Sequence, residues 1–137
     1  MKKIVVLLIA FLFIACCAGV QKVKKEIKEE PNYSGKWTGQ SFIDGQGMVD
    51  NIDLNLVHEG GAITGVISDT QGFMSNAILS NTELKGKSLT FSFIASTPMG
   101  NVQVNTTGTF SDDGKELVLS FKVPNLNIGG NAKLKKS

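Results

Sequence analysis

The chain has 137 residues, with 14 basic and 12 acidic residues, one histidine, two cysteines and 42% hydrophobic residues. This length predicts a single domain with short appendages. All 14 basic residues are lysines. Specific recognition of bases and phosphates usually depends on the planar, bidentate guanidinium group of arginine, so this composition argues against a nucleic-acid partner.

The N-terminus has the layout of a secretory signal peptide. Two lysines follow Met1, an unbroken apolar run covers residues 4–15, and small residues surround Cys16 and Cys17. An apolar region of about 7–15 residues is typical of signal peptides. Extended through Val20, the run reaches 17 residues, the short limit of the roughly 17–25 needed to span a membrane. An uncleaved anchor and ordinary secretion are therefore the alternatives.

The segment Phe13-Ile14-Ala15-Cys16 resembles the lipobox of bacterial lipoprotein precursors. The resemblance implies cleavage before Cys16, a diacylglyceryl group on its thiol and often acylation of the new amino terminus. Two or more acyl chains make such an attachment stable, because each buried CH₂ contributes about 0.8 kcal/mol. The expected partner is a membrane and the expected location is the cell envelope outside the cytoplasm. Cys17 is not the aspartate that retains some lipoproteins at the inner membrane, which favours the outer membrane in a two-membrane host.

Residues 20–33 are rich in lysine and glutamate and poor in apolar groups. Such a segment buries too little to fold by itself and is expected to be a flexible tether. Both cysteines precede it, so the domain that follows has no disulfide, thiol nucleophile or cysteine-zinc site. We expect a signal peptide over residues 1–15, a lipidated cysteine and tether over residues 16–33, and a folded domain over residues 34–137. Loss of the signal peptide would leave 12 lysines against 12 acidic residues.

From residue 34 onward, apolar and polar residues alternate with a period of two, which predicts strands and no helix. Eight runs separated by turn residues cover residues 35–43, 48–58, 62–68, 73–84, 88–96, 102–110, 116–123 and 126–134. Connections of about two to five residues are too short for parallel crossovers, which favours an antiparallel up-and-down meander. Closure into a barrel would remove exposed edges, and glycines inside the runs favour the necessary bends. Two stacked sheets are the alternative.

The segment Gly35-Lys36-Trp37 begins the first run and resembles the Gly-x-Trp motif of the calycins, the superfamily of lipocalins, fatty-acid-binding proteins and avidins. The resemblance implies an eight-stranded antiparallel up-and-down barrel in which Trp37 packs across one end. No arginine is available late in the chain to stack on this tryptophan. Trp37 is also the only tryptophan, so the aromatic box of avidins has no counterpart and biotin binding is not implied.

An eight-stranded barrel is either filled by side chains or holds one small ligand. Small residues at inward positions, Ala95, Thr106 and Gly108, would leave space. The candidate ligand contacts are the inward residues Trp37, Leu54, Leu56, Phe91, Phe93, Val104, Phe110, Leu119 and Phe121. We expect the barrel to bind or shuttle a small apolar or amphipathic ligand. The alternative is a non-enzymatic envelope interaction or scaffold protein with a solid core, and a cavity of about 300 Å³ or more would separate the two.

Catalytic and metal-binding motifs are lacking. His58 is the only imidazole, and it lies next to Glu59 and a Gly-Gly turn, where a solvated side chain is the simpler interpretation. The turn containing Asp112 and Asp113 lacks the spaced oxygen ligands and bidentate glutamate of a calcium loop. The sequence has no phosphate loop and no Gly-x-Ser-x-Gly motif. We therefore predict no enzymatic activity, no cofactor and no metal, and the sequence leaves the oligomeric state open.

Overall fold

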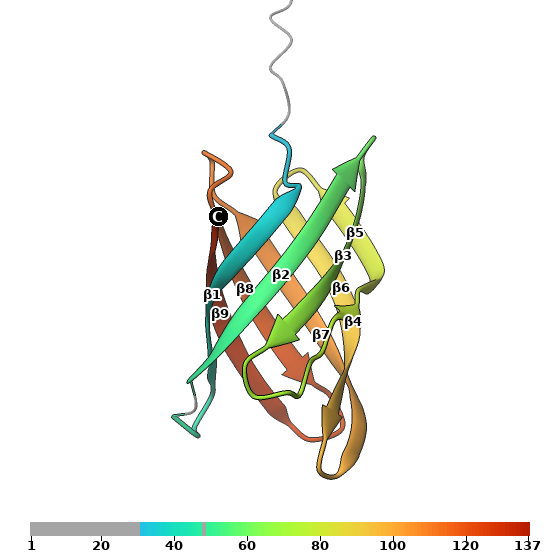
Figure 1. Cartoon of the computed structure of the whole chain (residues 1–137), viewed down its shortest axis with the longest axis vertical. Coiled ribbons are helices and arrows are strands. Elements are labelled where there is room, and N and C mark those ends of the chain that lie inside the picture. The colour runs from blue at the N-terminus through green and yellow to red at the C-terminus, as the bar shows by residue number, and fades with distance from the viewer. Residues whose placement is uncertain (1–30, 48) are drawn as a thin grey trace, which may run out of the picture. The chain divides into compact units, whose positions relative to one another are not determined.

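The computed structural model describes residues 31–47 and 49–137. The expected signal peptide, the lipidation site at Cys16 and most of the tether lie outside the described residues. The described residues form one sheet of nine antiparallel strands (Figure 1). These strands are β1 (Gly35–Ile43), β2 (Val49–Glu59), β3 (Ala62–Asp69), β4 (Ala77–Ile78), β5 (Ser80–Lys85), β6 (Ser88–Thr97), β7 (Gly100–Phe110), β8 (Glu116–Val123) and β9 (Ile128–Lys136).

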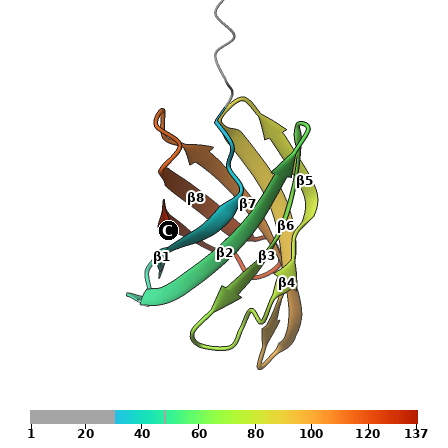
Figure 2. The same cartoon turned by 45° about the horizontal axis from the view of Figure 1, so that its top comes forward.

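The sheet curls into a nearly closed barrel with the strand order β4-β3-β2-β1-β9-β8-β7-β6-β5 (Figures 1 and 2). The first and last strands meet through the pairing of β1 with β9. The two ends of the order, β4 and β5, are consecutive in the chain and separated only by Leu79, whose N–H donates to the carbonyl oxygen of Gly65 at 3.0 Å. Together β4 and β5 bridge β3 and β6. This confirms the predicted all-β, antiparallel up-and-down barrel.

The structure has nine strands instead of the predicted eight because the fourth run, residues 73–84, is interrupted. Its first part is a connection, since the Asp69 carboxylate accepts three backbone N–H groups from the residues that follow. The backbone is left-handed at Asn76 and Asn81, with φ of 49° at each. Asn76 directly precedes β4, and Asn81 lies inside β5 where its register with β6 shifts between Ser80 and Glu83. The run is divided at Leu79, because β4 pairs with β3 whereas β5 pairs with β6.

The core is formed by alternate residues of the strands, as the period of two requires. Tyr33, which the sequence places at the end of the tether, belongs to this core and is only 3% exposed. The buried hydrophobic residues are Tyr33, Trp37, Ile52, Leu54, Leu56, Ile63, Ile67, Leu79, Leu89, Phe91, Phe93, Ala95, Val104, Phe110, Leu117, Leu119, Val123, Ala132 and Leu134. Phe121 and Ile128 are partly buried against them.

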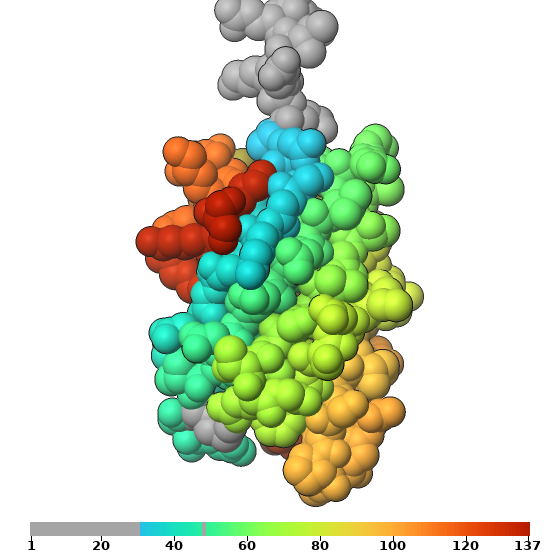
Figure 3. Space-filling model, viewed as in Figure 1, coloured from blue at the N-terminus to red at the C-terminus, as the bar shows by residue number. Residues whose placement is uncertain are grey.

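Two glycines allow β9 to approach β1 closely. A Cβ atom added to Gly39 would lie 1.9 Å from the carbonyl oxygen of Lys133, and one added to Gly130 would lie 2.2 Å from the carbonyl oxygen of Phe42. Backbone atoms cannot yield as a flexible side chain can, so both positions require glycine for this strand spacing. Side chains of β1, β2 and β3 cover the middle of the barrel face that is seen in Figure 3.

Candidate functional site

The two ends of the barrel differ in structure (Figure 1). One end carries the β2–β3, β5–β6 and β7–β8 turns, and we call it the closed end. The other carries four connections that join β1 to β2, β3 to β4, β6 to β7 and β8 to β9, and we call it the open end. The closed end is defined by Tyr33, Trp37, His58, Phe110 and Lys136, and the open end by residues 44–47, 70–76, 98–99 and 124–127.

Stacked aromatic rings fill the closed end. The rings of Tyr33 and Phe110 are parallel, with centroids 3.7 Å apart, and the Trp37 ring is tilted by 56° against Phe110 at 5.2 Å. Trp37 has no exposed surface, and its indole N–H donates to the carbonyl oxygen of Tyr33 at 3.0 Å. Aromatic pairs of this kind contribute about 0.5–1.5 kcal/mol beyond the area they bury. The closed end is therefore a packed plug.

Lys136 and His58 complete the closed end. The Lys136 ammonium lies 5.8 Å from the centroid of the Trp37 ring and donates to the carbonyl oxygen of Asn32 at 2.9 Å. The sequence offered no arginine late in the chain to stack on Trp37, and in the structure Lys136 of the last strand supplies the cation over this ring. The Nδ1 atom of His58 accepts the backbone N–H of Tyr33 at 3.3 Å, and its ring stacks on that of Tyr33. Both side chains hold the segment that precedes β1.

A cavity of about 260 Å³ occupies the other half of the barrel and opens between the connections of the open end. Its lining is mainly apolar and comes from seven of the nine strands and from all four connections. Apolar lining residues include Ile52, Ile67, Met74, Phe93, Ala95, Val104, Leu119, Phe121, Val123, Ile128 and Ala132. A mainly apolar concave site with a few polar groups is the general form of a small-molecule site. This cavity is the candidate functional site.

Small side chains account for the space. Ala95 on β6, Ala132 on β9 and Thr106 on β7 all line the cavity. Gly108 has a different role, because a Cβ atom there would lie 2.6 Å from Cδ2 of Leu119. Leu119 therefore packs directly against the backbone of β7 below the cavity. Ala95 and Thr106 leave space as the sequence suggests, whereas Gly108 permits close packing.

The structure divides the nine candidate ligand contacts into two groups. Four of them line the cavity, and the other five fill the closed half of the core. The cavity group is Phe93, Val104, Leu119 and Phe121. The packed group is Trp37, Leu54, Leu56, Phe91 and Phe110. Sequence reasoning could place all nine on inward faces by alternation, but it contained no signal for which half of the barrel is filled.

Acidic residues at the open end are the part of the site that sequence reasoning missed. Asp50 and Asp69 both line the cavity. The Asp50 carboxylate accepts the hydroxyl of Thr70 at 2.8 Å. Burial raises the pKa of Asp69, and the neighbouring Asp50 raises it further, while N–H groups donated by Met74 and Gly72 oppose the rise. The available signal was alternation, because Asp50 continues the inward row of Ile52 by two residues.

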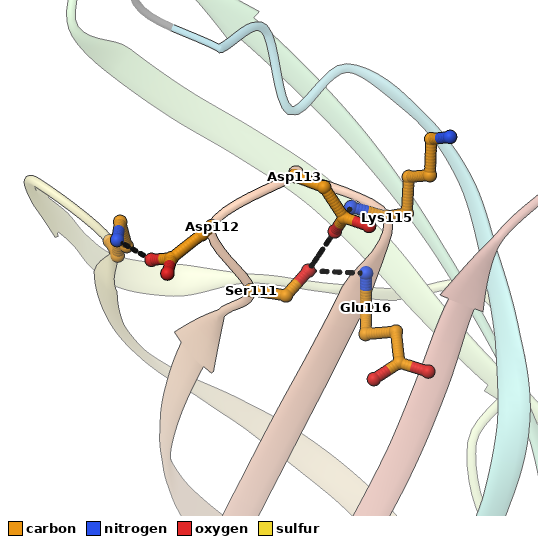
Figure 4. A network of polar contacts seen from close by, with 6 residues as sticks. Ser111, Asp112, Asp113, Lys115 and Glu116 are labelled. Carbon is orange, nitrogen blue, oxygen red and sulfur yellow. Dashed lines mark hydrogen bonds and ion pairs between the residues drawn. The ribbon is translucent and has the colours of Figure 1, made fainter.

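The Asp112-Asp113 turn lies at the closed end, away from the cavity, and its carboxylates are used locally (Figure 4). Asp112 forms an ion pair with Lys87. Asp113 accepts the Ser111 hydroxyl at 2.5 Å and the Lys115 N–H at 3.1 Å, and the Ser111 hydrogen bond is the main cause of a lowered pKa at Asp113. Over residues 31–47 and 49–137, no group of three histidine, cysteine or acidic side chains is arranged to hold a metal ion.

Comparison of the chain with protein-family models gives no match, and comparison with curated proteins gives none either. Among the residues that the structure describes, there is no helix with the length and hydropathy needed to cross a membrane.

Proposed function

We propose that this protein binds or shuttles a small hydrophobic or amphipathic ligand in the open-end cavity. We further propose that it does so in the cell envelope outside the cytoplasm, anchored by acyl chains on Cys16. The anchor is supported by the lipobox-like segment, and the calycin resemblance is supported by the burial of Trp37 at one end of the barrel. The observation that carries the binding proposal is the apolar, accessible cavity.

The cavity volume limits the size of the ligand. At about 260 Å³ it falls just below the 300 Å³ that we set for a carrier, and below the range of about 300–1,000 Å³ for drug-sized ligands. An apolar cavity of about 150 Å³ is nevertheless sufficient for benzene. The proposed ligand is therefore smaller than a typical drug molecule, such as a single short alkyl chain with a polar head.

A non-catalytic role is part of this proposal. His58, the only imidazole in the chain, uses its Nδ1 atom to accept the Tyr33 N–H at the closed end. The histidine is not among the residues that line the cavity. A general base must lie within hydrogen-bond reach of the proton it removes. A ligand in the cavity would thus be out of reach of the best candidate base.

The test is native mass spectrometry and organic extraction of the full chain purified without detergent. We expect a bound apolar molecule of reproducible mass. The Ala95→Leu variant should lose that molecule, because leucine would fill space that Ala95 leaves open. The matched control is Ile94→Leu on the same strand, where the side chain is 51% exposed and points outward. Equal ligand content in the two variants, or an empty wild-type protein that cannot be loaded, would contradict the proposal.

A second candidate function is protein interaction in the envelope. It is favoured by Phe42 and Val49, which pair across β1 and β2 and are 49% and 45% exposed on the outer face. Crosslinking in intact cells should then give a reproducible protein product. Loss of that product in a Phe42→Ser variant, with the cavity empty in wild type, would favour this function over ligand carriage.

A further inference from the structure

Charged residues at the two ends of the inward rows have opposite signs. Side chains that face the interior recur at every second residue of a strand. The inward row of β2 reaches the open end at Asp50, and the inward row of β3 reaches it at Asp69. The inward row of β9 reaches the closed end at Lys136, over the Trp37 ring. The inward rows therefore end in two carboxylates at the cavity mouth and in a lysine at the plugged end.

No basic side chain neutralises the acidic mouth within the described part of the chain. The cavity lining contains neither lysine nor histidine. Lys122, on the strand that contributes Phe121 and Val123 to the lining, is exposed on the outer face. The four ion pairs of the described residues use other acids, namely Lys36–Asp53, Lys85–Glu83, Lys87–Asp112 and Lys133–Glu116. A ligand head at this mouth would meet carboxylates without a protein cation beside them.

A second, independent observation concerns the cavity wall. Thr106 is 4% exposed and lines the cavity, and its hydroxyl has no hydrogen-bond partner among the described residues. A buried polar group left unpaired costs about 1–3 kcal/mol, and such groups in folded proteins nearly always have partners. The hydroxyl can both donate and accept. A polar atom of a bound molecule inside the cavity would satisfy it.

We propose that the cavity takes a small cationic amphiphile, with an apolar body in the cavity, a protonated amine at the Asp50 and Asp69 carboxylates, and a hydrogen-bonding atom near Thr106. This inference rests on the proposed function, because it specifies the class of ligand for the same cavity. The lining supplies burial for the apolar body, and the two carboxylates attract an ammonium group and repel a carboxylate. Fatty-acid anions would thus be disfavoured despite their apolar chains.

The experiment compares three ligands of equal chain length, decylamine, decanol and decanoate, with the full chain purified without detergent and stripped of bound molecules. Affinity is measured by calorimetry at pH 7, and the site by NMR of the Ala95 and Ala132 methyl groups, with the Ile63 methyl groups in the closed half as the internal control. We expect decylamine to bind about tenfold or more tighter than decanoate, which corresponds to about 1.4 kcal/mol. Decanol should lie between them.

Two variants test whether the carboxylates at the cavity mouth cause the preference for decylamine over decanoate. Asp50→Asn keeps an acceptor for Thr70 but removes the charge, and it should reduce the preference of the cavity for decylamine over decanoate by about threefold to tenfold. Asp112→Asn removes an acid at the closed end that pairs with Lys87, and it should leave the preference unchanged. A third variant, Thr106→Val, tests the hydrogen bond at the cavity wall. The hydroxyl of 8-amino-1-octanol can increase its affinity over that of octylamine only through Thr106, so the variant should bind the two amines equally tightly.

The outcomes are distinguishable. If none of the three decyl ligands binds, the proposed ligand cavity is wrong and this inference is wrong with it. If decanoate binds as tightly as decylamine, or if Asp50→Asn changes the preference no more than Asp112→Asn does, the cavity is a ligand site but its cationic selectivity is refuted. Binding that shifts the Ile63 methyl groups and not those of Ala95 and Ala132 would refute both.

Discussion

The indole N–H of Trp37 donates to the carbonyl oxygen of Tyr33 at 3.0 Å, while the two side chains pack on the same Phe110 ring. This contact fixes the segment that precedes β1 across the closed end of the barrel. It also places the point where residues 31–34 join the barrel at the end opposite the cavity mouth. Access to the cavity is thereby kept separate from the N-terminal connection.

Replacing Trp37 by phenylalanine should lower the free energy of unfolding by about 1–3 kcal/mol, because the change leaves a small void and removes the donor to Tyr33. Urea denaturation monitored by circular dichroism measures the change. Val57→Thr is the control, since Val57 is 49% exposed on the outer face of β2 and should alter stability by less than about 0.5 kcal/mol. An equal decrease of the free energy of unfolding in the two variants would show that the Trp37 contacts do not stabilise the fold specifically.

Gly39→Ala should separate β1 from β9. Its Cβ atom would lie 1.9 Å from the carbonyl oxygen of Lys133, so the strands must move apart, at a cost of about 1–3 kcal/mol. Gly129→Ala is the matched control, because its nearest backbone atom, the carbonyl oxygen of Phe121, lies at 3.3 Å. We expect equilibrium unfolding and hydrogen exchange of β1 amides to report a larger effect at position 39. A larger effect at position 129 would contradict the proposed reason for glycine at the seam.

Burial is the main cause of the raised pKa of Asp69, and the neighbouring Asp50 raises this pKa further. Asp50→Asn removes that acidic group and should therefore lower the pKa of Asp69. Carboxyl carbon NMR titration gives the value directly. An unchanged pKa would mean that burial alone causes the shift.

The same shift has a consequence for stability. The pKa of Asp69 is raised in the folded state, so its contribution to stability is fully present below the ordinary value of 3.8 and is lost as pH rises through the folded pKa. The Asp50→Asn variant should therefore lose less stability than wild type over this rise in pH. Denaturation midpoints measured on both sides of the transition check the sign.

Ser111→Ala should raise the pKa of Asp113 toward its ordinary value of 3.8, because the Ser111 hydroxyl is the main cause of its lowering. A lowered pKa gives stability that is present above the ordinary value and is lost as pH falls through the folded pKa. The Ser111→Ala variant should therefore lose less stability than wild type as the pH falls through the acidic range. Lys87→Ala removes the ion pair of the adjacent Asp112 and should leave the Asp113 titration unchanged. An equal rise of the Asp113 pKa in both variants would mean that nearby charge, and not the Ser111 hydrogen bond, causes the shift.

The alternation of apolar and polar residues was enough to predict the strands and the inward rows, and the short connections between the runs were enough to predict their antiparallel order. Leu117 and Leu119 are buried as alternation requires, since the period of a strand is a local property of the backbone. The division of the fourth run was not predictable in this way. It depends on the hydrogen bonds that the Asp69 carboxylate accepts from the connection, and on the change of pairing partner at Leu79, since β4 pairs with β3 and β5 with β6.

The sequence by itself determined an all-β chain with apolar inward faces and a lipobox-like N-terminus. Only the tertiary structure decided that the half of the barrel near Trp37 is filled while the half near Ala95 and Ala132 is open. Packing depends on the summed volume of side chains from strands far apart in the chain, which no local pattern records. The same holds for Asp50 and Asp69, whose shared position at the cavity mouth arises only from the pairing of β2 with β3.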